Sequence, residues 1–219
     1  MQRKIDWPNH LIGFVLIVFS ILMAFQLERC STDRREDRLV EAHLEEILEE
    51  TRFNRSSLQG TLDGLERSNR GLDTLLQLID AGADPAVINN WTMRNLNIPP
   101  FYLRNTSYQL LTTSGDMRLI DDFSTKRDIV ALYEYHRQAE AFNNLLLDTY
   151  QEDYYGYLQQ HFDLRYGRPA TLAEYRDRRF LNGVSSLLFF VRRCDGLYQQ
   201  HLERMDAFLA KYGEAMASG

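Results

Sequence analysis

The residues best suited to chemistry in this 219-residue chain are isolated histidines and acidic side chains. His136 and Glu140 lie one helical turn apart and Tyr133 precedes them, so the three resemble part of a metal or proton-transfer site. Two ligands on one turn are an incomplete ligand set for a metal ion. We therefore expect His136 to be a half-buried structural histidine.

A second group of titratable side chains is acidic. Glu41, Glu45 and Glu49 recur every four residues, a spacing that could attract a divalent cation or a basic partner. His43 lies among these carboxylates, which favour its protonated form. Because charged runs of this kind are mostly solvated, the pattern predicts an exposed helix face and no metal site.

The sequence lacks the common motifs whose residue types and spacing identify enzyme active sites. It has no Cys-x-x-Cys, no Gly-rich phosphate loop, no Gly-x-Ser-x-Gly and no His-Glu-x-x-His. Of the two cysteines, Cys194 fits an apolar helix stripe, whereas Cys30 could be a free thiol or an intermolecular bridge. We expect a protein that is not an enzyme, with no catalytic residue, no cofactor and no metal ion.

Aromatic side chains crowd residues 150–166, where they could pack in a core, line a ligand pocket or stack on bases. The chain has 25 basic and 31 acidic residues and a formal charge of −6. Such a balance argues against a nucleic-acid partner, because phosphates are held by a surplus of Lys and Arg. Core packing is the favoured interpretation of this Tyr-rich segment.

An irregular stretch around Pro99 and Pro100 is the favoured place for a partner surface, because connectors carry function more often than helix faces do. Ser114 and Gly115 fit either this surface or the end of a short helix. The residues predicted to form the surface are Trp91, Phe101, Tyr102, Ser107, Tyr108, Ser114 and Gly115.

The elements that must position these residues are long helices. Prolines occur only at positions 8, 85, 99, 100 and 169, and apolar residues recur with spacings of three and four between them. This pattern predicts helices at about 33–81, 124–165 and 183–212, with a connector over 82–123 and a short helix after the capping box Thr171–Glu174. No strand-like alternation of useful length appears. We expect an all-α fold in which residues 29–219 form a single antiparallel helical bundle.

An uncharged apolar run from Leu11 to Leu27 precedes the charged helix. Its length suits a bilayer core, so we expect a short tail over 1–10 and a single transmembrane helix over 11–28 that continues into the charged helix. A cleaved signal peptide fits less well, because Ala24-Phe25-Gln26 is a poor cleavage site. A buried core helix is the other alternative.

Three small residues, Gly13, Ser20 and Ala24, share one face of this helix. Such stripes let two membrane helices approach closely, which suggests a homo-oligomer or a protein partner. The alternative is that these three small residues reflect only the usual composition of membrane helices.

Three phrases together resemble a domain-of-unknown-function family of bacterial single-span membrane proteins. They are LIGFVLIVFSILMAFQLE, NTSYQLLTTSGDMRLID from Asn105 and DIVALYEYHR from Asp128. The resemblance implies an inner-membrane anchor followed by an all-helical domain in the periplasm. The count of Lys and Arg alone would place that domain inside the cytoplasm. The chain departs from the family pattern at Phe14 and at Glu28-Arg29-Cys30.

Taken together, these patterns predict a membrane-anchored, non-enzymatic interaction or scaffold module whose partners are the lipid bilayer and a protein. A ligand-sensing helical bundle, with a pocket near the connector and the Tyr-rich helix, is the alternative.

Overall fold

The computed structural model describes residues 7–169 and 171–217, and it gives side-chain surroundings for residues 14–169 and 171–213. The protein is 85% helical with almost no strand, so the all-α prediction is confirmed. The predicted tail falls partly on residues 1–6, which lie outside the described residues.

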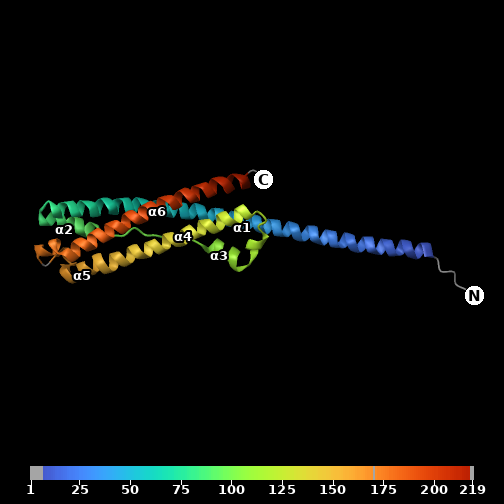
Figure 1. The fold of residues 1–219 in the computed structure, drawn as a ribbon, viewed down its shortest axis with the longest axis horizontal. Coiled ribbons are helices and arrows are strands. Elements are labelled where there is room, and N and C mark those ends of the chain that lie inside the picture. Colours follow the sequence, from blue (N-terminus) through green and yellow to red (C-terminus); the bar gives the residue numbers. More distant parts are fainter. Residues whose placement is uncertain (1–6, 170, 218–219) are drawn as a thin grey trace, which may run out of the picture.

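The first helix, α1, is a single element of 74 residues, Trp7–Asp80 (Figure 1). All side chains from residue 14 to residue 39 are exposed, and the first fully buried apolar side chain is Ile47. Among the described residues, α1 alone is long and apolar enough to cross a membrane, and none of its apolar window is buried. Figure 1 shows this N-terminal part projecting from the packed helices.

The connector after α1 contains more structure than the sequence suggested. Helix α2, Pro85–Arg94, begins with Asp84 as its N-cap, as the Asp-Pro pair indicated. The chain then runs without helix until α3, Thr106–Thr113, and a 3₁₀ turn η1, Asp116–Leu119. The connector therefore holds three short helical pieces around an extended segment.

The second long helix begins at Phe123, with Asp122 as its N-cap, one residue before the predicted start. It consists of α4, Phe123–Thr149, a π-helical segment η2, Tyr150–Tyr155, and α5, Gly156–His161. The prediction that it continues to residue 165 was wrong. The chain leaves the helix at Phe162 because strand β1, Phe162–Asp163, pairs antiparallel with β2, Arg168–Pro169.

The last elements also start differently from the prediction. The capping box of Thr171 and Glu174 is present, but it opens a short 3₁₀ helix η3, Leu172–Arg176. Helix α6, Arg178–Ala217, begins earlier than residue 183 and continues past Gly213. An interior glycine lowers helix propensity without ending a helix that packing supports.

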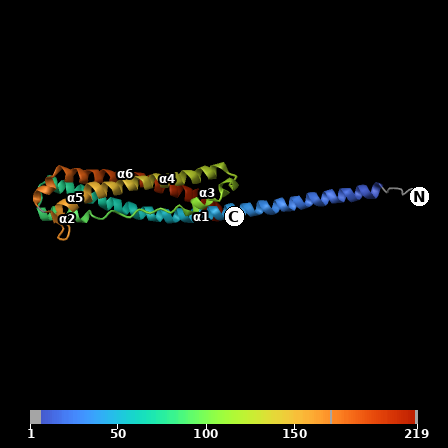
Figure 2. The same cartoon turned by 90° about the horizontal axis from the view of Figure 1, so that it is seen from below.

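The three long helices lie side by side (Figures 1 and 2), and α6 contacts both α1 and α4. Helix α6 runs opposite to the other two, whereas α1 and α4 run in the same direction. The two long pairs that contact each other, α1 with α6 and α4 with α6, are therefore antiparallel, whereas α1 and α4 are parallel to each other. The reason is the extended connector, which carries the chain back along α1 before α4 begins.

Most of the apolar stripe predicted on α1 is buried between these helices, and a leucine fully removed from water contributes about 2 kcal/mol. Gly64 and Gly71 allow the connector to approach the helix closely. A Cβ atom at Gly64 would overlap Pro99, and one at Gly71 would overlap the Asn95 side chain. We call the packed part of the protein, residues 40–213, the helical body.

Candidate functional site

A row of polar side chains on α1 fixes the extended connector. Glu50, Asn54, Ser57 and Thr61 are spaced by four, three and four residues, so they share one helix face. Ser57 Oγ donates to the Tyr102 carbonyl at 2.7 Å. Thr61 Oγ1 donates to the Pro100 carbonyl at 2.8 Å. These bonds replace water as the partner of backbone groups that no helix or sheet satisfies.

Asn54 is the centre of this row and is completely buried. Its Oδ1 accepts from the Arg104 backbone N–H, and its Nδ2 donates to the Arg104 carbonyl, both at 2.7 Å. Nδ2 also lies 2.9 Å from Nε2 of His136 on α4. A single amide therefore joins α1, the connector and α4.

His136 is buried, and its bonds define its neutral form. Nδ1 lies 2.8 Å from the Leu132 carbonyl, which can only accept, so Nδ1 carries the proton and Nε2 accepts from Asn54. Burial lowers the pKa of His136. His136 is thus more deeply buried than the half-buried position expected, and it forms no hydrogen bond with Glu140 among the described residues.

A second buried histidine, His201 on α6, packs edge-on against His136 with ring centroids 4.5 Å apart. Neither of its ring nitrogens has a hydrogen-bond partner among the described residues. Desolvation, with help from the nearby His136 and Arg204, lowers the pKa of His201 to about 3. Both histidines are therefore neutral at physiological pH.

Glu50 sits at the other end of the polar row and is almost fully buried. It accepts a bond from the Tyr133 hydroxyl and a 3.0 Å bond from the Ser107 backbone N–H. Burial and the Glu50 carboxylate both raise the pKa of Tyr133, which remains a hydroxyl donor. The Tyr133 ring stacks on Tyr108, with centroids 4.3 Å apart, and so fixes the start of α3.

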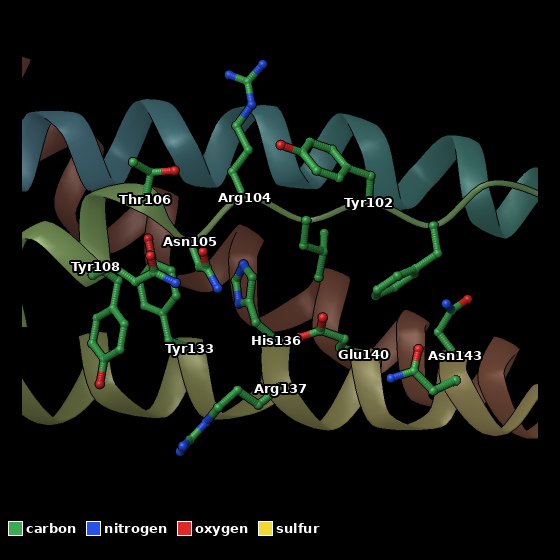
Figure 3. Close-up of a pocket in the computed structure, with 14 residues that line it drawn as sticks. Tyr102, Arg104, Asn105, Thr106, Tyr108, Tyr133, His136, Arg137, Glu140 and Asn143 are labelled. Carbon is green, nitrogen blue, oxygen red and sulfur yellow. The ribbon is translucent and has the colours of Figure 1, made fainter.

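Between the connector and α4 lies a cavity of about 600 Å³, which we call the connector cavity (Figure 3). Its volume is within the range of small-molecule sites. The connector contributes residues 101–106 and 108–109, and α4 contributes Tyr133, His136, Arg137, Glu140, Asn143 and Asn144.

Charged side chains around the connector cavity point in different directions. Figure 3 shows Arg104 and Arg137 directed away from its middle, on opposite sides, whereas Asn105, His136 and Glu140 turn toward it. The Arg104 guanidinium lies over the Phe53 ring at 3.4 Å, and Arg137 pairs with Glu134 at 3.0 Å. The three charged side chains of the lining, Arg104, Arg137 and Glu140, are all exposed, and the other lining side chains include amides and aromatic rings.

The structure brings together only part of the predicted partner surface. Phe101, Tyr102 and Tyr108 line the connector cavity, and Ser107 lies beside it with its backbone bonded to Glu50. Tyr102 is 59% exposed, whereas Phe101 stacks on Tyr198 of α6.

The other three residues of the predicted surface lie elsewhere. Trp91 is half-buried on α2 and does not line the cavity. Ser114 is the C-cap of α3, and Gly115 follows it with a φ of 80°, a left-handed conformation that favours glycine. Ser114 and Gly115 therefore end a short helix, which was the alternative interpretation.

The predicted helix-association face lies on the projecting part of α1. Ser20 and Ala24 are exposed there, and the Ser20 hydroxyl donates to the Leu16 carbonyl at 2.8 Å. Gly13 belongs to α1 but lies outside the residues whose surroundings the structure describes. Whether this face associates with another helix stays a prediction.

Most of the remaining chemical candidates are buried in the helical body. Tyr154 and Tyr157 are buried, and the Tyr154 hydroxyl donates to the Thr92 carbonyl at 2.9 Å. His43 is buried with Nε2 3.1 Å from Asp116. Cys194 is buried and Cys30 is exposed, both as free thiols.

Within the described residues, no three His, Cys, Asp or Glu side chains lie close enough together to bind a metal ion.

Sequence reasoning missed the polar row and the buried amide of Asn143. The signal for the row was present, because Glu50, Asn54, Ser57 and Thr61 recur at helical spacing along the apolar stripe of α1. An apolar stripe of this spacing is typical of contact with another helix, whereas the polar members of this one bind an extended chain. Nothing in the sequence distinguishes Asn143 from its exposed neighbour Asn144.

Comparison of the chain with protein-family models, with curated proteins and with solved structures found no match. The resemblance to a family of bacterial single-span membrane proteins therefore stays a prediction.

Proposed function

We propose that the protein is a membrane-anchored, non-enzymatic interaction module. The observation that carries this proposal is the continuity of α1, which contains both an exposed apolar segment and a major part of the buried core. The apolar part of α1 would cross a bilayer once, and the helical body would pack as a bundle outside it. Because one helix serves both purposes, motion of the anchor and motion of the body are mechanically linked.

The length of α1 sets the distance between the bilayer and the helical body. Residues 28–39 are exposed and follow the apolar run, and they span about 18 Å at 1.5 Å per residue. Their four acidic and four basic side chains are intermixed, as expected of a solvated helix. We propose that this segment holds the body clear of the lipid headgroups, in the periplasm of a bacterial cell, where it binds a protein partner or a second copy of the chain.

Cys30 offers a direct test of the orientation. It is exposed immediately after the apolar run, whereas Cys194 is fully buried and its pKa is raised to about 11, so only Cys30 should react with a maleimide. In intact spheroplasts a membrane-impermeant maleimide is expected to label the wild type and not Cys30→Ser. Labelling only after the membrane is broken would place the body in the cytoplasm.

The interaction itself is tested by photo-crosslinking in cells. A photoreactive residue in place of Tyr102, which is 59% exposed beside the predicted surface, should give one discrete crosslinked species. The matched control is the same residue in place of Phe189, which is 61% exposed on α6 away from the connector. Absence of any species specific to position 102 would contradict a partner surface at the connector.

A ligand-sensing body is a second candidate function, favoured by the connector cavity. Asn54 joins the cavity wall at Arg104 and His136 to α1, so a ligand that shifts either wall acts on the helix that leads to the bilayer. Spin labels at Cys30 and on α6 would report a ligand-dependent change in their separation. An unchanged distance in the presence of bound ligand would contradict sensing through α1.

A further inference from the structure

We infer that the connector binds a short extended peptide of a protein partner, which adds as a strand to the edge of residues 101–103 that faces away from α1. This inference rests on the first proposed function, an interaction module, and it names the kind of partner segment that the module takes. It does not depend on the side of a membrane that the helical body occupies, because the edge belongs to the helical body alone.

The connector between α2 and α3 is extended. Asn95 lies against Gly71 of α1, and Arg104 is bonded to Asn54 of the same helix. These two positions on α1 are about 26 Å apart, so the chain advances about 2.8 Å at each step from residue 95 to residue 104. A strand advances about 3.3 Å per residue and a helix only about 1.5 Å. The segment is thus close to a strand in its rise, although within the described residues no strand pairs with it.

One edge of this extended segment is occupied by α1. The backbone of every second residue, at positions 100, 102 and 104, is bonded to the polar row of that helix. At Arg104 the bonding is the most strand-like, because the Asn54 amide pairs with both the N–H and the carbonyl, as a residue of a neighbouring strand does. The polar row therefore takes the place of a neighbouring strand on this side.

The opposite edge has no neighbour. In an extended chain the polar groups of successive residues point to opposite sides, so those of Phe101 and Leu103 point away from α1. Neither their N–H groups nor their carbonyls have a hydrogen-bond partner in the part of the chain that the structure describes. Both residues are half-buried and line the connector cavity. An unpaired edge of this kind is a template for a second chain, whose backbone would lie about 4.8 Å away.

The occupant that fits this edge is a single extended chain. A helix bonds its own N–H and carbonyl groups internally, so it cannot pair with Phe101 and Leu103. The edge borders a cavity of about 600 Å³ between the connector and α4, which a single chain enters more easily than a packed sheet does. In strand addition the main-chain bonds supply affinity, and alternate side chains of the added strand enter pockets.

The lining of the cavity indicates the composition of the peptide. Phe101, Leu103 and Tyr108 present apolar surface in it, which suits apolar side chains at every second position of the added strand. The charged side chains of the lining have both signs and are exposed, so they favour neither a strongly acidic nor a strongly basic peptide. The partner segment is therefore an extended peptide of alternating apolar and polar residues with little net charge.

The test begins with a library of random decapeptides displayed on phage and selected against the immobilised full-length protein in detergent. Enriched peptides are expected to carry apolar residues at every second position, which is the period of a strand. Failure to enrich any peptide, or enrichment of peptides whose apolar residues recur every three and four positions, would overturn the inference.

N-methylation of the most enriched peptide distinguishes main-chain pairing from contacts of its side chains. Methyl groups on the nitrogens of alternate residues block one edge of a strand and leave the other edge free. One alternate set is expected to weaken binding at least tenfold, whereas the other set, which is the matched control, should weaken it no more than about threefold, since only one edge pairs with the connector. Equal effects of the two sets would contradict strand addition.

A variant of the connector locates the edge. Leu103→Pro removes the N–H at position 103 and is compatible with an extended residue before it, so it is expected to weaken peptide binding at least tenfold relative to Leu103→Ala, which keeps the N–H. Protection of the Phe101 and Leu103 amides from hydrogen exchange when the peptide binds to wild type is a second readout that needs no variant. Equal affinities of the two folded variants, or no protection of these amides, would overturn the inference.

The outcomes separate this inference from the function on which it builds. A crosslinked species at position 102 that forms equally well in Leu103→Pro would leave the interaction module intact and refute strand addition. Peptides that pair with the free edge, in a protein that gives no crosslinked species at position 102 in cells, would support the peptide site and contradict the proposed partner surface. Neither result bears on whether α1 crosses a membrane.

Discussion

Asn54 on α1 donates a hydrogen bond to Nε2 of His136 on α4, with 2.9 Å between the two nitrogens. The bond fixes the tautomer of His136, because the opposite ring nitrogen lies 2.8 Å from the Leu132 carbonyl. The same amide pairs with both backbone polar atoms of Arg104. The exposed part of α1 ends at Leu39, fifteen positions before Asn54, and through Arg104 and His136 the junction connects α1 to the wall of the connector cavity.

Replacement of Asn54 by alanine should destabilise the helical body strongly. The change leaves the Arg104 N–H and carbonyl and His136 Nε2 without partners, which costs about 3 kcal/mol in the free energy of unfolding. Thermal unfolding followed by circular dichroism measures the loss. Asn69→Ala is the control, because Asn69 bonds only the exposed Arg192, and its effect should stay below about 1 kcal/mol. Equal losses in the two variants would contradict a central role for Asn54.

Mild acid should destabilise the folded protein through its buried histidines. The pKa values of His136 and His201 are lowered by burial, the latter to about 3, whereas the unfolded chain has values near 6.5. Below pH of about 6.5 the unfolded state therefore binds protons that the folded state does not, and stability falls as the pH decreases toward the folded pKa values. Each such histidine contributes a slope of about 1.4 kcal/mol per pH unit.

The histidine contribution can be measured separately from that of the carboxylates. Asp116, a part-buried carboxylate whose pKa is lowered by bonds with Ser114 and His43, stays ionised in the folded protein between pH 6.5 and about 4.5. In this window His201→Phe should reduce the slope of unfolding free energy against pH by about half. The same slope in wild type and variant would show that His201 is already charged in the folded protein.

Two glycines on α1 give opposite predictions for the same substitution. At Gly64 a methyl group would overlap Pro99 of the connector, so Gly64→Ala should destabilise the body by about 1 to 3 kcal/mol. At Gly60 there is no atom within 4 Å, so Gly60→Ala should stabilise it by up to about 1 kcal/mol through helix propensity. The two thermal midpoints, compared with wild type, check the path of the connector along α1. A stabilising Gly64→Ala would place the connector elsewhere.

The small residues of the apolar segment give a prediction about assembly. Gly13→Ile combined with Ala24→Ile should weaken any self-association, because larger side chains keep two membrane helices apart. Chemical crosslinking in cells measures the change, and Leu16→Ile with Leu22→Ile is a control of similar composition. If the yield of crosslinked protein is the same for the wild type, the double variant and the control, the small residues of α1 do not mediate self-association.

The helices were predictable because apolar spacing and caps are local signals. The buried stripe of α1, the N-cap Asp122 and the capping box at Thr171 follow from residues three or four positions apart. The end of α5 was missed because a two-residue strand pairing at Phe162 replaces the last helical turn. Such a pairing depends on contacts that no periodicity reveals.

The candidate site was predictable only as a region. Proline and aromatic residues identified the connector, and Phe101, Tyr102 and Tyr108 do line its cavity. The parallel direction of α1 and α4 could not be inferred, because it depends on eleven residues, 95–105, that run back along α1 without helical structure. The position of Glu140 in the cavity follows from that path and was therefore out of reach of the sequence.

The central claim is that α1 stays attached and holds the helical body at a bilayer. The most direct measurement is extraction of cell membranes with sodium carbonate, followed by the intact mass of the protein in the pellet and in the supernatant. We predict the protein in the carbonate-resistant pellet, with a mass that includes residues 11–27. A soluble protein whose mass lacks the first thirty residues would contradict the account.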